Sequence, residues 1–154
     1  MFFSAFELDA GCAVLLHVVG GDVDADFEAM LAAIAHMDEA LCGHRCPIAM
    51  QIVDDDVPVP DARWRRRLAD ATATLHSAHG AYLLVTPSTA VRGAVTAINW
   101  LRPPPCEFAM HTTVAQAVAW AEERRGEPIP ALFNLEARVR RASMRTSTRP
   151  PPMR

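Results

Sequence analysis

Residues 81–102, AYLLVTPSTAVRGAVTAINWLR, decide the fold class of this chain. An apolar run, 81–85, is followed by Pro87, and either Ser88 or Thr89 can act as the N-cap of a helix. The apolar residues after this cap recur at helical spacing and form one buried face, and three consecutive prolines end the helix. The stretch therefore predicts a buried strand followed by a helix, the unit from which parallel α/β sheets are built.

The same alternation extends in both directions along the chain. Further strands are predicted at residues 2–8, 12–19, 47–53 and 106–111, and further helices begin after Asp22 or Asp24, after Asp61 and after Thr112 or Thr113. The order is strand, strand, helix, strand, helix, strand, helix, strand, helix, and the second helix is expected to end at Gly80. The predicted fold is an α/β domain with a mixed sheet of about five strands and about four helices.

The chain divides into three segments by composition. Its 154 residues are enough for one domain, which we expect at residues 1–126. Residues 127–142 are interrupted by proline but still apolar, and they predict a short packed arm. Residues 143–154 are rich in Ser, Thr, Pro and Arg and predict a disordered tail.

The charged residues exclude several mechanisms. All 15 basic residues are arginine, so chemistry that needs a lysine is excluded, including the P-loop, Schiff bases and phosphoacceptor receiver domains. The net charge is −3, and residues 136–154 hold six arginines against one acid, or +5. The rest of the chain therefore has a net charge of −8, since −3 minus +5 is −8. This distribution predicts an acidic folded body with a basic tail.

The sequence lacks the patterns of secretion, membrane insertion and specific nucleic-acid binding. It has no signal-peptide pattern and its four cysteines are scattered, which predicts a cytoplasmic protein with reduced thiols. It has no apolar run long enough for a membrane span and no basic face with interleaved aromatics for sequence-specific nucleic-acid binding. The basic tail suits weak contact with anionic surfaces, and Ser143 follows Arg140-Arg141-Ala142 as a candidate phosphorylation site.

Three consecutive aspartates, Asp54, Asp55 and Asp56, follow a predicted buried strand. Open α/β sheets bind ligands at the carboxyl ends of their strands, and clustered carboxylates there are suited to Mg²⁺. Hydrolases of the Asp-x-Asp type also need a lysine, which this chain lacks. We therefore favour a solvated acidic turn over a metal site.

A polar stripe is predicted on the helix after residue 88. Thr96 and Asn99 follow Arg92 at +4 and +7, beside the apolar face of the helix and at the same sheet edge as the aspartates. Three interpretations remain open. The stripe binds a partner or ligand, it is an ordinary solvated face, or Arg92 forms an ion pair with one of the aspartates.

Other residues with catalytic or metal-binding chemistry lack partners at suitable spacing. Cys42, His44 and Cys46 have no second ligand pair for zinc, and a loop with free thiols is the favoured interpretation. The histidines are assigned to packing or surface roles because no triad is identifiable; they are His17, His36, His44, His76, His79 and His111. The sequence predicts no catalytic residue, no metal and no cofactor.

Residues 82–101 and 112–121, together with the strand order, resemble the STAS domain, and more narrowly the SpoIIAA-like (STAS/SEC14-type) group of bacterial proteins. The matching pieces are Arg92-Gly93 at the start of one helix, the Trp-Leu at its end, and an Ala-x-x-Trp in the last helix. The resemblance covers about residues 1–125. It implies a non-enzymatic protein-interaction module in a bacterial regulatory or signalling pathway.

In the family, a serine or threonine just after the third strand is phosphorylated to control binding of an anti-sigma-factor kinase. The equivalent stretch here, residues 53–61, contains neither residue. The resemblance therefore implies either that the aspartates imitate a phosphorylated loop or that the loop has another partner.

Three functions follow from these observations. The first is an interaction module without catalysis, which contacts an unidentified protein partner and is also a candidate homodimer. Its candidate partner-binding residues are Asp54, Asp55, Asp56, Arg92, Thr96 and Asn99. The second is a small-molecule or lipid-binding SEC14-like domain. The third is a metal-dependent hydrolase that uses the three aspartates.

Overall fold

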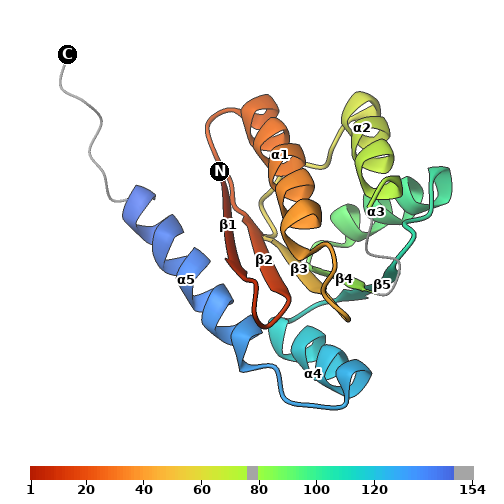
Figure 1. The fold of residues 1–154 in the computed structure, drawn as a ribbon. Helices are drawn as coiled ribbons and strands as arrows, with labels where there is room; N and C mark the ends of the chain where they lie inside the picture. Colours follow the sequence, from red (N-terminus) through yellow and green to blue (C-terminus); the bar gives the residue numbers. More distant parts are fainter. Residues whose placement is uncertain (76–79, 148–154) are drawn as a thin grey trace.

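The computed structural model describes residues 1–75 and 80–147 of the chain, so His76, His79 and tail residues 148–154 lie outside the described part. It contains a five-stranded sheet with helices on both faces (Figure 1). The strands are β1 (Phe2–Glu7), β2 (Cys12–His17), β3 (Ile48–Val53), β4 (Ala81–Val85) and β5 (Glu107–His111). The helices are α1 (Val23–Leu41), α2 (Ala62–Ala73), α3 (Thr89–Leu101), α4 (Val114–Arg125) and α5 (Pro130–Ser147).

The α/β class and the mixed sheet agree with the sequence prediction. The strand order is β1-β2-β3-β4-β5, with β1 antiparallel to β2 and all later pairs parallel. Strands β2, β3 and β4 are buried along their whole length, because helices cover both faces of the sheet. The carboxyl ends of β2, β3, β4 and β5 lie at one edge of the sheet, and their amino ends lie at the opposite edge.

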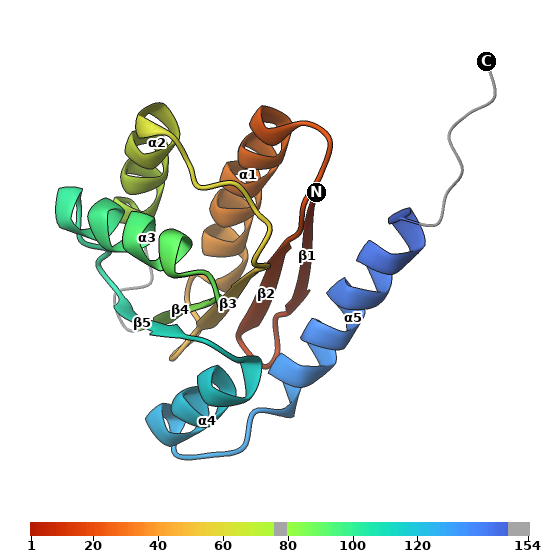
Figure 2. The same ribbon diagram turned by 180° about the vertical axis from the view of Figure 1, so that it is seen from behind.

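Helices α1, α2 and α3 lie on one face of the sheet, and α4 and α5 lie on the other (Figure 2). The side chains of β2 alternate between the two cores. Leu15 packs with α1 and α2, whereas Val14 and Leu16 pack with α4 and α5. None of the described helices is both long enough and apolar enough to cross a membrane.

Polar caps fix where four helices begin. Asp22, Asp61, Ser88 and Thr113 accept backbone N–H hydrogen bonds at 3.0, 2.9, 3.3 and 3.3 Å, respectively. Asp61 was predicted without an alternative and is confirmed. At each of the other three starts the sequence left two candidates open, and the structure selects one.

The end of α2 corrects the sequence prediction. The helix ends at Ala73 instead of continuing to Gly80. The hydroxyls of Thr72 and Thr74 donate to backbone carbonyls three and four residues earlier, at 3.0 to 3.3 Å. Such bonds compete with helix propagation, which explains the early end.

Residues 1–75 and 80–147 contain five helices, where the sequence predicted about four. The additional helix, α5, takes in most of the segment predicted as a packed arm and runs past residue 143, where the tail was expected to begin. Pro130 is the first residue of α5, a position that proline favours because its missing N–H is not needed there. Leu132, Leu135 and Val139 recur at +3 and +4 and are buried against the sheet.

Ion pairs and an indole connect α2 to α1. The guanidinium of Arg63 lies 2.8 Å from Asp24, and Arg67 pairs with Glu28. Between the two arginines, Trp64 is buried, and its indole N–H donates to Asp24 at 2.7 Å. The hydrogen bonds from Arg63 and Trp64 lower the pKa of Asp24 below its ordinary value. Arg63 and Arg67 therefore pair with acids of the same chain.

Candidate functional site

The run of aspartates forms a turn at the carboxyl end of β3. The backbone N–H of Asp54 donates to the carbonyl of His17 at 3.0 Å, and the N–H of Val57 donates to the carbonyl of Asp54 at 3.2 Å. Val57 is buried and clusters with Val91 of α3. Because the turn is held at both ends, the positions of the two aspartates between them, Asp55 and Asp56, are restrained.

The three aspartates have different surroundings. Arg140 of α5 donates to both carboxylate oxygens of Asp54, at 3.1 and 3.3 Å, and also to Glu136 at 3.0 Å. Asp55 and Asp56 are exposed, and neither forms an ion pair in the described part of the chain. Two unpaired carboxylates therefore face solvent at this edge, while the third pairs with Arg140 within the protein.

In the described part of the chain, no hydrogen bond or ion pair joins the polar stripe to the aspartates. Arg92 donates to the hydroxyl of Thr89 at 3.4 Å, and the hydroxyl of Thr96 donates to the carbonyl of Arg92 at 2.9 Å. Asn99 borders a cavity of about 60 Å³ that Thr72 of α2 also lines. Of the three open interpretations, the ion pair between Arg92 and an aspartate is not formed. The arginine that pairs with an aspartate comes from α5.

Ser143 also lies within α5, where its hydroxyl donates to the carbonyl of Arg140 at 2.8 Å. The candidate phosphorylation site is therefore helical and half-buried.

His17 is the last residue of β2, and its backbone carbonyl accepts the hydrogen bond from Asp54 at the start of the acidic turn. Its ring meets Phe2 and Phe27 edge-on, with centroids 6.0 and 5.6 Å apart. Burial, helped by the N-terminal ammonium, lowers the pKa of His17 to about 4, while the nearby Asp26 and Asp54 act in the opposite direction. The imidazole is neutral at pH 7 and packs as an aromatic ring, as the sequence analysis assigned.

This burial makes stability pH-dependent. His17 binds a proton more readily in the unfolded chain than in the folded one, so stability is lost as pH falls from about 6.5 toward about 4. Between pH 7 and pH 5 we expect His17 to account for a loss of about 2 kcal/mol. Urea unfolding of the wild type and of His17→Leu at both pH values measures this difference. Equal losses in the two proteins would contradict it.

A buried polar chain lies in the core under α1, α2 and α3. The hydroxyl of Tyr82 donates to the side-chain carbonyl of Gln51 at 2.6 Å, and the amide of Gln51 contacts the sulfur of Met30 at 2.9 Å. Burial raises the pKa of Tyr82, so its hydroxyl stays neutral. The cavities that border this chain have volumes of about 40 and 60 Å³. This buried polar chain was not predicted, although Gln51, a glutamine inside an apolar strand, was a signal for it.

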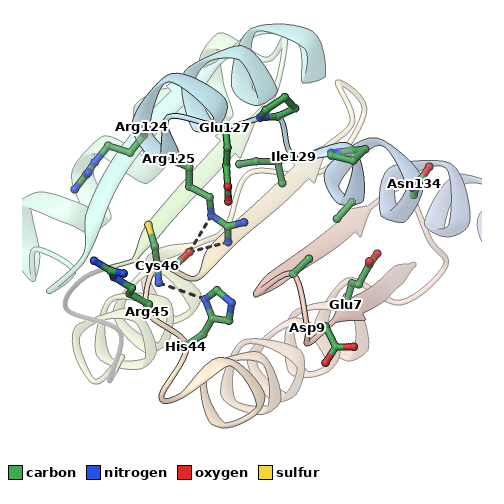
Figure 3. Close-up of a pocket in the computed structure, with 14 residues that line it drawn as sticks. Glu7, Asp9, His44, Arg45, Cys46, Arg124, Arg125, Glu127, Ile129 and Asn134 are labelled. Atoms are coloured by element: carbon green, nitrogen blue, oxygen red, sulfur yellow. Dashed lines mark hydrogen bonds between the residues drawn. The ribbon is translucent and has the colours of Figure 1, made fainter.

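A groove of about 1000 Å³ lies at the opposite end of the sheet, near the amino ends of β2 and β3 (Figure 3). The Arg125 guanidinium reaches from α4 and donates to the carbonyls of Cys46, at 2.7 and 3.1 Å, and Gly11, at 3.2 Å. The backbone N–H of Cys46 donates to Nδ1 of His44 at 3.3 Å. Arg125 thus connects α4 to two loops, and these hydrogen bonds give it a structural role.

The cysteine and histidine pattern does not form a cluster. Cys42 is exposed at the end of α1, apart from the bonded pair His44 and Cys46. Burial raises the pKa of the Cys12 thiol in β2, so it stays protonated at neutral pH. Among residues 1–75 and 80–147, no three His, Cys, Asp or Glu side chains are grouped to hold a metal ion.

The acidic turn, with its exposed Asp55 and Asp56, is thus open to a partner. Comparisons with protein-family models, with curated proteins and with solved structures gave no match to this chain.

Proposed function

We propose that this chain is a non-enzymatic, STAS-like protein-interaction module of a bacterial regulatory pathway, and that it binds a basic surface of a protein partner through the acidic turn. The observation that carries the proposal is the pair of exposed carboxylates, Asp55 and Asp56, on a turn held at both ends. Restrained charges at a surface favour association because they need little reordering on binding.

The pairing of Asp54 with Arg140 refines the hypothesis of a phosphorylated-loop mimic. The contact pairs one of the three carboxylates within the protein, where it shares the guanidinium of Arg140 with Glu136. The turn then presents two negative charges, a number comparable to that of one phosphate group. In this proposal Asp55 and Asp56 contact the partner, and Asp54 positions the turn.

Neither the cavities beside the buried polar chain nor the large groove suits an apolar ligand, and a further depression of ligand size, about 630 Å³, lies between α1 and the end of α2, near Ile34 and Leu75. Pockets for small molecules typically have volumes of about 300 to 1000 Å³ and mostly apolar walls. The cavities near the buried polar chain are about 40 and 60 Å³. The large groove at the other end of the sheet is lined by charged side chains, including Glu7, Arg45 and Arg124, which a lipid tail would not favour.

Affinity capture from a bacterial lysate tests the proposal. We expect the wild-type chain to retain a partner that Asp55→Asn/Asp56→Asn loses, with binding weakened at least about tenfold because the partner's cations lose their counter-charges. The matched control is Glu123→Gln/Glu127→Gln, which removes two exposed charges elsewhere. Identical partner lists for all three proteins, or no partner for the wild type, would contradict the proposal.

A further inference from the structure

The outer flank of α3 exposes an apolar stripe that no described element covers. Its residues follow one another at +3, +4, +3 and +1, and they are Ala90, Gly93, Ala97, Trp100 and Leu101. Trp100 is 84% exposed and Leu101 is 64% exposed. Tryptophan is usually well buried, and adjoining large apolar side chains at a surface mark an interaction site.

The rest of α3 is turned toward the protein. Val91 and Ile98 pack into the core, Asn99 borders the cavity next to α2, and Arg102, just after α3, pairs with Asp70 of α2 at 3.1 Å. The apolar stripe is therefore on the flank directed away from α2. In both ribbon views α3 and β5 lie at the end of the molecule opposite α5 (Figures 1 and 2). A large partner could reach this flank without displacing any element.

We propose that a second copy of this chain binds here, with the two α3 helices packed antiparallel about a two-fold axis near Thr96 and Ala97. A two-fold interface requires a surface that is complementary to itself. Gly93 and Trp100 lie equally far from this axis, so each Trp100 faces Gly93 of the second copy. Apart from its two chain neighbours and the backbone of α3 itself, no atom of the described residues lies within 4 Å of where a Cβ on Gly93 would be, which leaves room for the indole.

Charge complementarity favours the antiparallel arrangement. Arg92 lies in the first turn of α3, where a cation is unfavourable for its own helix dipole, and it has no acidic partner in the described part of the chain. The last turn of α3 contains no basic residue, and the charge of Arg102, its C-cap, is paired with Asp70 of α2. In the antiparallel pair, Arg92 faces the carboxyl end of α3 in the second copy, near Leu101, where the helix carbonyls favour a cation.

The area of the apolar stripe indicates how strongly two copies of the chain can associate. A tryptophan side chain buries about 200 Å². The rest of the stripe consists of one leucine and three small residues. The two copies together then bury an area near the lower limit of about 1000 Å² for specific interfaces, so we expect a weak, concentration-dependent dimer.

Sedimentation velocity from about 5 to 500 µM tests this interface. We expect the wild-type mass to rise with concentration toward twice the 16.8 kDa of one chain. Trp100→Ala and Gly93→Leu should each weaken the dimer at least about tenfold, the first by removing the indole and the second by filling its site. Phe133→Ala removes an exposed apolar side chain from α5 and should dimerise like the wild type.

Gly93→Leu distinguishes this interface from nonspecific association of apolar surfaces. It adds apolar surface and helix propensity, so nonspecific association would increase, whereas the proposed dimer is blocked. A wild type that stays monomeric at 500 µM, or a Gly93→Leu protein that dimerises as well as the wild type, would overturn the inference. The inference is independent of the proposed function, because Asp55→Asn/Asp56→Asn should leave dimerisation unchanged.

Discussion

Replacing Leu135 by alanine is expected to lower the free energy of unfolding by about 3 kcal/mol. Leu135 is fully buried and belongs to the core that α5 forms with the sheet. The substitution removes apolar burial and leaves a cavity that the surrounding strands cannot fill. Urea denaturation monitored by circular dichroism measures the loss.

The control for this prediction lies two residues earlier on the same helix. Phe133 is 46% exposed, so Phe133→Ala should change stability by less than about 1 kcal/mol. If α5 were only a loosely attached arm, Leu135→Ala would cost no more than this control. Similar stabilities of the two variants would therefore contradict the role of α5 as part of the core.

Trp64→Ala is expected to lower the free energy of unfolding by about 4 kcal/mol. The indole is 2% exposed, and it stacks on Phe27 of α1 with ring centroids 5.2 Å apart. Its N–H donates to Asp24, and Arg63 and Arg67 lie over its ring at 4.8 and 4.6 Å. One side chain therefore supports the contact between α1 and α2 by burial, stacking and a hydrogen bond.

Two further variants separate these contributions by the same measurement. Trp64→Phe keeps an aromatic ring against Phe27 but loses the bond to Asp24, and it should cost about 1 to 2 kcal/mol. Trp100→Ala removes an exposed tryptophan and should cost less than about 0.5 kcal/mol. If Trp64→Ala cost no more than Trp100→Ala, the described packing of α2 would be wrong.

Local patterns in the sequence were sufficient for most of the fold. In residues 81–102, β4, one of the two candidate caps (Ser88) and α3 follow one another, because strand burial, capping and helical spacing depend on neighbouring residues. The start of α5 was missed for a local reason. Pro128 and Pro130 were interpreted as interruptions, although proline is favoured at the first position of a helix.

The candidate site was less predictable because its main contact is long-range. Asp54 and Arg140 are 86 positions apart, and only the packing of α5 on the sheet brings them together. No local pattern distinguishes Asp54 from Asp55 and Asp56. Likewise, the orientation of Asn99 toward α2 depends on how two helices pack, which helical spacing alone does not determine.

The most direct measurement of the central claim is calorimetric titration of the captured partner with the wild type, Asp55→Asn/Asp56→Asn and Glu123→Gln/Glu127→Gln at low and high salt. The account predicts that only Asp55→Asn/Asp56→Asn loses at least about tenfold in affinity at low salt, and that added salt narrows its difference from the wild type because the lost contacts are electrostatic. Equal affinities for the three proteins at low salt would contradict it.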